Sequence, residues 1–478
     1  MSEATTATSD DELDDSPLKR SITGRLLFFY VLGDVLGSGI YVLIGAVAGE
    51  VGGAFWAAFA AGVTVAAFTG LAYAELATKF PQAAGASLYV NKAFKKTSLT
   101  FMVTVLYLSA TFAAAGSLAA GFAKYFGELW ELPPTLLVMI LFILLLAFIN
   151  YIGITESVVV NMLMTIVEVT GLVIVLIAGA MYIGQGKADF GTLADFSSGD
   201  NIIFAIIAGV ALAFFAMTGF ENAANVAEET INPQKSFPRA LVGGMIAAGV
   251  IYVLVSIAAA LTVPVDTLAS SDAALLEVIR AGILPISVSV MVTVFAVIAM
   301  IAITNTTLVQ VVTQSRILYG MAREDVVPAP FAKVHSSRRS PWVALIFSAM
   351  VVVALLVIGS LLNEAGFGID IVERLAAVTV VLLLVVYAGV IISCFKLRGE
   401  GETEKTFRAP TTLLLIGLVG NLVLLYYVIS TDPSSLLWCA GLIGLGVLLY
   451  VVEYFFGHRD RPAGAKRGDP ETGAGEGI

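Results

Sequence analysis

Residues 33–40 read Gly-Asp-Val-Leu-Gly-Ser-Gly-Ile and interrupt a long apolar segment near its middle. Glycine inside a helix costs about 1 kcal/mol relative to alanine, so Gly37 and Gly39 make local unwinding easy. Unwinding exposes amide and carbonyl groups that an apolar environment cannot satisfy, so such a break must face a cavity or a ligand. For one glycine pair alone, the alternative is close packing of helices through small residues. The pattern favours a binding site at a broken helix.

The composition of the whole chain identifies the environment of this segment. The chain has 478 residues, of which 58% are hydrophobic and 13% are charged. Soluble domains carry about 25% charged residues. The apolar residues occur in long runs, and about 20 such residues span the ~30 Å hydrocarbon core of a bilayer. These values exclude a soluble enzyme and predict an all-α polytopic membrane protein.

Twelve apolar runs predict twelve transmembrane helices. Their approximate bounds are 26–49, 54–78, 98–126, 134–151, 157–184, 201–227, 237–262, 284–320, 341–362, 371–396, 411–430 and 435–456. With the N-terminus inside, the outer loops hold only four of the 26 Lys and Arg residues: Lys124, Lys187, Arg280 and Arg374. The positive-inside rule therefore predicts that both termini are cytoplasmic, in a multi-pass protein of the cell membrane.

A second break lies in the sixth predicted helix, where residues 214–221 read Phe-Phe-Ala-Met-Thr-Gly-Phe-Glu. If helices 1–5 and 6–10 form two repeats, the two breaks occupy corresponding positions. Paired interruptions of this kind are the best sequence indication of a transporter binding site. The start of a half-helix offers free amides to an anion such as a carboxylate, and the freed carbonyls suit an ammonium group or a cation.

The domain boundaries follow from the repeats. We predict an acidic cytoplasmic N-terminal tail (1–25), a first repeat (26–184), a second repeat (201–396), two further helices (411–456) and a cytoplasmic C-terminal tail (457–478). A repeat of five helices must be inverted in the membrane relative to its partner. That inversion is the structural basis of alternating access.

Four stretches carry a resemblance to a known family. They are Gly37-Ser38-Gly39-Ile40; Glu75-Leu76 with Pro81, Gly85 and Tyr89; residues 214–221 with Ala227-Glu228-Glu229, Asn232-Pro233 and Pro238-Arg239; and Ser315-Arg316-Ile317-Leu318-Tyr319 with residues 321–325 and Pro328. In these stretches the sequence resembles the amino acid–polyamine–organocation (APC) superfamily of permeases, whose members share a LeuT-like fold. The loop after the second helix departs from the family pattern, since it lacks the usual glycine pair followed by two aromatic residues.

The resemblance implies a 5+5 inverted repeat with helices 1 and 6 broken, and an amino acid as substrate. It implies that the substrate carboxylate binds the backbone amides of Ser38, Gly39 and Ile40. It also implies that the substrate amino group lies on the carbonyls of Val35, Phe215, Ala216 and Thr218, with the Phe215 ring closing over the substrate. Further side-chain contacts to consider are Tyr107, Thr304 and Asn305.

Ionisable side chains inside a membrane are energetically costly and are usually retained for a function. Glu168, in the middle of the fifth helix, is the first candidate for the proton carrier, because a carboxyl withdrawn from water can exchange a proton near neutral pH. The alternatives are a sodium ligand or an acid bound to a neighbouring helix. Asp34 could join the coupling site or cap a half-helix, and Glu221 could orient the unwound segment or touch substrate. Glu75 is expected near the inner face, where Lys235, Arg239 or Arg316 could pair with it.

The predicted function is a secondary active amino acid transporter that uses alternating access and is coupled to protons. The alternatives are a sodium-coupled symporter, an exchanger, or a transporter of amines or polyamines. An ion channel is disfavoured because no selectivity-filter segment stands out. An intramembrane enzyme is also disfavoured, because the two histidines lie outside the predicted helices and cannot serve as catalytic or metal-binding residues within them. We expect no cofactor beyond H⁺ or Na⁺, no metal site, no nucleic-acid partner and contact with membrane lipid, and leave the oligomeric state open.

Overall fold

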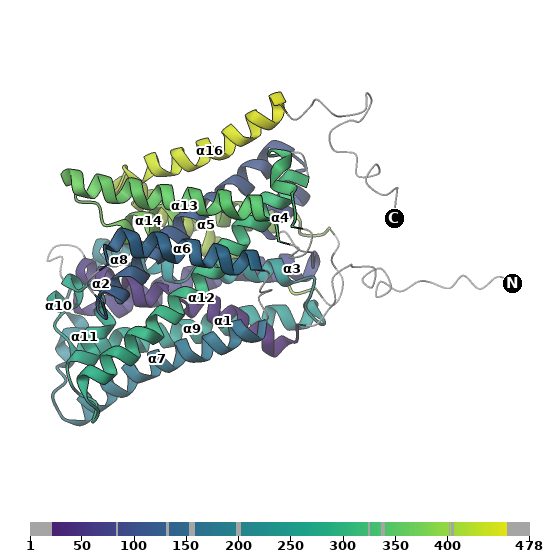
Figure 1. Cartoon of the computed structure of the whole chain (residues 1–478). Helices are drawn as coiled ribbons and strands as arrows, with labels where there is room; N and C mark the ends of the chain where they lie inside the picture. The colour runs from purple at the N-terminus through teal and green to yellow at the C-terminus, as the bar shows by residue number, and fades with distance from the viewer. Residues whose placement is uncertain are drawn as a thin grey trace, which may run out of the picture.

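The computed structural model describes residues 22–82, 85–130, 133–152, 158–196, 202–323, 326–335, 340–400, 402 and 406–456. Most of the predicted N-terminal tail and the whole C-terminal tail, together with Glu324 and Asp325 of the fourth family stretch, lie outside these ranges. The described residues form one bundle of long helices whose axes are roughly aligned with one another (Figure 1). We call the end where α1 begins and α16 ends the proximal end, and the opposite end, near α10 and α11, the distal end.

The α-helices are numbered in chain order. They are α1 (Gly24–Leu36), α2 (Gly39–Val51), α3 (Trp56–Lys79), α4 (Gly85–Phe94), α5 (Thr97–Gly127), α6 (Thr135–Ile152), α7 (Val158–Gly184), α8 (Ile202–Ala216), α9 (Pro233–Thr262), α10 (Val265–Ser270), α11 (Ala274–Arg280), α12 (Val288–Arg323), α13 (Trp342–Leu362), α14 (Ile371–Lys396), α15 (Thr411–Thr431) and α16 (Ser435–Phe456). Among the described residues the only β-type pairing is an isolated bridge between Ile22 and Thr230.

In the described part of the chain the helices form twelve spans that are long and apolar enough to cross a membrane, with α1 and α2 together forming the first, and each span agrees with a predicted helix to within five residues. The fold-class prediction is confirmed, including its two breaks. In the first span α1 stops at Leu36 and α2 starts at Gly39. In the sixth span α8 stops at Ala216 and, after a turn, the short 3₁₀ helix η3 (Phe220–Val226) follows.

Small residues let the helices of the bundle interior approach closely. A Cβ built at Gly209 on α8 would lie 2.2 Å from Val51 on α2, and one at Gly249 on α9 would lie 2.3 Å from Val63 on α3. Contacts this close depend on glycine, which is the usual packing device between membrane helices. Large apolar side chains are instead exposed on the outer helices, such as Leu141 on α6 and Leu437 on α16. This distribution suits a lipid-facing surface.

A buried ion pair lies near the proximal end of α3. The Arg398 guanidinium donates to both carboxyl oxygens of Glu75, at 3.1 and 2.9 Å, and also to the carbonyl of Ala409 at 2.6 Å. Glu75 is 2% exposed and also accepts from the Ala409 amide at 2.8 Å. The partner expected for Glu75 was Lys235, Arg239 or Arg316, and that expectation is wrong for this residue. Arg398 instead ties α3 to the segment that leads into α15.

Replacing Arg398 with leucine leaves the Glu75 carboxylate buried without its cation. Breaking a buried pair in this way costs about 3–5 kcal/mol. We expect Arg398→Leu to lower the melting temperature of the detergent-purified protein clearly. Arg408→Leu is the matched control, because Arg408 is 64% exposed and its nitrogen lies 3.8 Å from Glu402. Equal melting temperatures for the two variants would contradict a structural role for the Glu75–Arg398 pair.

Candidate functional site

The two breaks meet at the centre of the bundle. A Cβ added to Gly39 would lie 2.3 Å from the Cα of Ala216, so the start of α2 touches the end of α8 directly. Gly219 has φ +117°, a conformation that favours glycine, and a Cβ there would lie 2.7 Å from the carbonyl oxygen of Asp34. The glycines at both breaks are therefore required by backbone geometry and by close approach.

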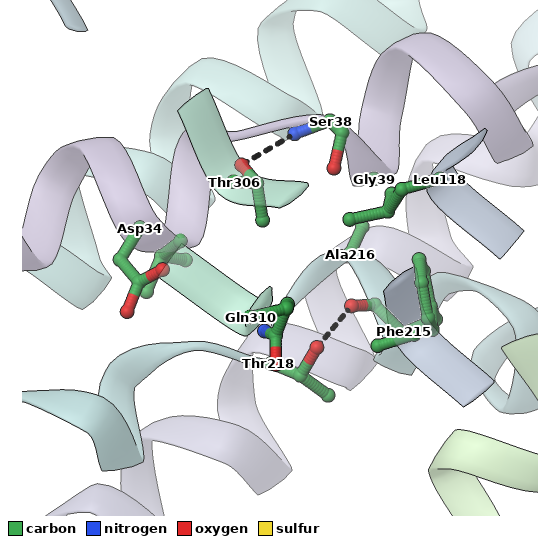
Figure 2. Close-up of a pocket in the computed structure, with 11 residues that line it drawn as sticks. Asp34, Ser38, Gly39, Leu118, Phe215, Ala216, Thr218, Thr306 and Gln310 are labelled. Atoms are coloured by element: carbon green, nitrogen blue, oxygen red, sulfur yellow. Dashed lines mark hydrogen bonds between the residues drawn. The ribbon is translucent and has the colours of Figure 1, made fainter. Parts of the chain in front are cut away.

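A small cavity lies between the breaks (Figure 2). Its volume is ≈ 10 Å³, and a single buried water needs ~10–15 Å³. The lining comes from the first break, the second break, α5 and α12: Asp34, Val35, Ser38, Gly39, Ala114, Leu118, Phe215, Ala216, Thr218, Thr306 and Gln310. Every residue predicted to bind substrate is in this set except Ile40. The structure brings these residues together, and their binding of substrate stays a prediction.

Sequence reasoning considered residues of α5 and α12 but did not identify the ones that line the cavity. Thr306 and Gln310 are four residues apart on α12, which puts them on one face of that helix. A polar pair at this spacing inside an apolar span was a readable signal. The three contacts considered instead do not line the cavity: Tyr107 donates to Asn222, Thr304 donates to the carbonyl of Met300, and Asn305 accepts from Asn161.

Hydroxyl groups of side chains form hydrogen bonds with the backbone groups that leave the helix at the two breaks. The amide of Ser38 donates to the Thr306 hydroxyl at 3.3 Å. The Tyr252 hydroxyl, on α9, donates to the carbonyl of Val35 and lies 3.1 Å from that of Ala216. The Thr218 hydroxyl donates to the carbonyl of Phe215 at 2.8 Å (Figure 2). The Phe215 carbonyl also accepts from the Thr218 amide at 3.1 Å, so both of its lone pairs are used, whereas the carbonyls of Val35 and Ala216 each keep a lone pair beyond the contact with Tyr252.

The first residues of α2 keep amides of a different kind. Gly39 and Ile40 open the helix, so neither has a carbonyl four residues earlier within it. The amides at a helix start also carry the positive end of the helix dipole. This end of the cavity is suited to an anionic oxygen.

Two acids hold the second break from the proximal side of the cavity. The Asp34 carboxylate accepts from the Asn222 amide at 2.9 Å, and Asn222 in turn accepts from Tyr107 on α5. The Glu221 carboxylate accepts from the Gly219 amide at 2.9 Å and from the Tyr387 hydroxyl at 2.7 Å. Glu221 does not line the cavity, and its geometry fits the orienting role that was one of its two predicted roles.

Glu168 lies on α7 beside the first break and is completely buried. Within the described residues neither of its carboxyl oxygens meets the geometry of a hydrogen bond. Asn305 on α12 and Asp34 on α1 are near enough to act on this carboxyl. Its own backbone carbonyl accepts from the Tyr41 hydroxyl at 2.8 Å. The same described ranges contain no cluster of three His, Cys, Asp or Glu residues suited to a metal ion.

Contacts join separate segments of the chain at both ends of the bundle. At the proximal end, Ile22 pairs through its backbone with Glu229 and Ile231 at 3.0 and 2.8 Å. At the distal end, the Lys124 ammonium lies 2.8 Å from Asp370 and 3.2 Å from Asp272.

The ion pairs at the distal end border a second cavity of ≈ 200 Å³. Burial alone would raise the pKa of Asp370, but the Lys124 ammonium outweighs burial and holds that pKa below its ordinary value. Asp370 therefore remains ionised at neutral pH, and its pair with Lys124 persists there.

Comparison with known proteins gives consistent relatives. A family model described as an amino acid permease matches residues 24–448. The branched-chain amino acid permease BcaP of Bacillus subtilis is 25% identical over 70% of this chain and 73% of its own length. The serine/threonine exchanger SteT of Bacillus subtilis is 25% identical over 94% of this chain and 99% of its own length. The chloroplastic cationic amino acid transporter 9 of Arabidopsis thaliana is 30% identical over 66% of this chain, which spans 58% of the plant protein.

Among solved structures, a manganese transporter of Eremococcus coleocola superposes with a TM-score of 0.63. The match covers 92% of this chain and 98% of the other, with 11% sequence identity. At that identity the likeness concerns the fold alone.

Tyr252 is expected to stabilise the junction of the two breaks. Tyr252→Phe leaves two buried carbonyls without this donor, which costs about 1–3 kcal/mol. Tyr73→Phe is a matched control, because the buried Tyr73 hydroxyl has no hydrogen-bond partner in the described part of the chain. Thermal unfolding in detergent should show a lower melting temperature for Tyr252→Phe and no decrease for Tyr73→Phe. A decrease of the same size in both would refute the specific role of the Tyr252 hydroxyl.

Proposed function

Because the chain belongs to the amino acid permease family, we propose that it carries a neutral amino acid across the cell membrane by alternating access, in symport with a proton. The family consists of transporters and not of enzymes, so the chemistry is binding and release. The observation that carries the proposal is the meeting of both breaks at one cavity, with helix-start amides at Ser38 and Gly39 and the carbonyls of Val35 and Ala216 at the same cavity.

The lining of the cavity supports a neutral substrate. Ala114, Leu118 and Phe215 offer an apolar surface, and Thr306 and Gln310 offer neutral polar groups. The one carboxylate among the lining residues, Asp34, already accepts from Asn222. BcaP and SteT, the two bacterial relatives, are named for branched-chain amino acids and for serine and threonine. Amines and polyamines fit less well, since they have no carboxylate for the amides of α2.

Glu168 supports coupling to a proton. Glu168 is a fully buried carboxyl, which is costly to ionise, and a conformational change that admits water lets such a group exchange a proton. A sodium ion at the same carboxyl is the alternative, because Asn161 and Asn305 contribute further oxygens nearby. Exchange without a coupled ion is a second candidate, and it rests on the nearly full-length similarity to SteT.

The charge distribution supports an orientation for the transporter. Four of the 26 Lys and Arg residues fall in loops on the distal side or at its helix ends, and the other 22 fall on the proximal side or in the tails. By the positive-inside rule the proximal end faces the cytoplasm. Substrate would then enter past Lys124 and leave past Ile22.

Uptake into proteoliposomes tests the function and the coupling ion together. Radiolabelled neutral, basic and acidic amino acids would be offered under an imposed pH gradient and, separately, an imposed sodium gradient. We expect uptake of neutral amino acids with the pH gradient. Glu168→Gln should reduce this uptake to the level found without a gradient, because glutamine cannot carry the proton. Glu453→Gln is the control, since Glu453 is also buried but lies on α16, outside both repeats.

Each result has a defined meaning. Uptake driven only by sodium would replace the proton by a sodium ion at Glu168. Uptake that needs internal amino acid but no gradient would make the protein an exchanger. Absence of both uptake and exchange for every amino acid would reject the substrate class and direct attention to amines and other organocations.

Gly39 is expected to be essential for transport. A Cβ at this position overlaps Ala216, and overpacking of this kind costs about 1–3 kcal/mol. We expect Gly39→Ala to lower the uptake rate by about tenfold or more. Gly62→Ala is the control, because its Cβ would meet Ala213, also on α8, at an ordinary 3.9 Å. Normal transport by Gly39→Ala would show that the two breaks need not touch.

A further inference from the structure

The Thr306 hydroxyl differs from those of its neighbours on α12. Thr304 and Thr307 each donate to the carbonyl four residues earlier, at 2.6 Å, as threonines in helices commonly do. Thr306 instead accepts from the backbone amide of Ser38, 268 residues away in sequence. Figure 2 shows this bond crossing the cavity wall from α12 to the segment between α1 and α2.

The partner of Thr306 is the amide of a residue proposed to bind the substrate carboxylate. Both residues are buried, with Ser38 at 1% and Thr306 at 8% exposure. The hydroxyl also lies close against the first break, since a Cβ at Gly37 would lie 2.1 Å from the Thr306 oxygen. An oxygen of the protein therefore occupies the side of the Ser38 amide where a substrate oxygen would bind.

We propose that the Thr306 hydroxyl is an internal substitute for the substrate carboxylate, which lets the empty carrier close and return. This inference rests on the proposed amino acid transport. In the empty closed state, Thr306 satisfies the Ser38 amide. When substrate enters, its carboxylate replaces the hydroxyl, which turns about χ1 and donates to the carbonyl of Ala302, as its neighbours do to theirs. Threonine in a helix populates two χ1 rotamers for this reason.

The energetics explain why a closed empty carrier needs such a group. Burying a hydrogen-bond donor without an acceptor costs a free energy that corresponds to about a tenfold change in an equilibrium constant or a rate. With substrate bound, the carboxylate supplies the acceptor and Thr306 is dispensable for closing. Without substrate, the cavity holds about one water, and Thr306 is the acceptor that the fold supplies. Loss of the hydroxyl should therefore slow the return of the empty carrier and leave the loaded steps intact.

Two transport modes separate these steps. Net uptake requires the empty carrier to return, whereas exchange of internal for external amino acid uses only the loaded carrier. For Thr306→Val in proteoliposomes, we expect the ratio of net uptake to exchange to fall about tenfold relative to the wild type. The half-saturation concentration for exchange should fall, because substrate no longer competes with the hydroxyl. Thr306→Ser, which keeps a hydroxyl, should restore net uptake.

Thr307→Val is the matched control, because it removes a buried hydroxyl that bonds only its own helix at Ile303. It should leave the ratio of net uptake to exchange unchanged. Thr306→Ala serves as a second variant without the hydroxyl, and the melting temperatures of all variants in detergent verify folding. An equal fall of uptake and exchange in both Thr306 variants would overturn the proposal, as would a ratio equal to that of Thr307→Val. Failure of the wild type to transport or exchange any amino acid would instead reject the underlying function.

Discussion

Backbone groups that leave a helix inside a membrane must find partners within the protein, because lipid offers none. The centre of this molecule follows from that requirement. Two helices are broken, and side chains of the protein bond several of the backbone groups that the breaks free. Tyr252 serves the carbonyls of Val35 and Ala216, and Thr306 serves the amide of Ser38. The amides at the start of α2 keep capacity for a ligand. A small zwitterion can therefore supply hydrogen-bond partners for the backbone groups that no side chain of the protein bonds.

Helix α12 connects this site with the buried acid on α7. Consecutive residues of α12 face in different directions: Asn305 bonds Asn161 and acts on the Glu168 carboxyl, whereas Thr306 lines the cavity. Because a helix moves as a rigid body over so short a distance, any shift of α12 that accompanies substrate binding also changes the surroundings of Glu168. Substrate binding and proton exchange can therefore influence each other through adjacent residues, without a long pathway across the bundle.

The sequence predicts the helices and the breaks because both depend on local composition. Apolar length defines a span, and glycine within a span marks where it can unwind, so the ends of the twelve helices and the breaks at Gly37 and Gly219 were accessible without a structure. The partners of the breaks were not. Tyr252 and Thr306 stand 217 and 268 residues from the groups they bond, and many other hydroxyl side chains lie within the spans. The partner of Glu75 was mispredicted for the same reason, since Arg398 is 323 residues distant and comes close only through packing.

The small volume of the cavity also distinguishes a carrier from a pore in physical terms. A pore must keep a continuous polar path, whereas here the two breaks meet around a space of only ≈ 10 Å³. Opening either end exposes the breaks to water, which can satisfy the Ser38 amide as Thr306 does. Closing both ends removes that water, so an acceptor must be present before closure is favourable. Substrate and the Thr306 hydroxyl are the two acceptors available, so both the loaded and the empty carrier can close.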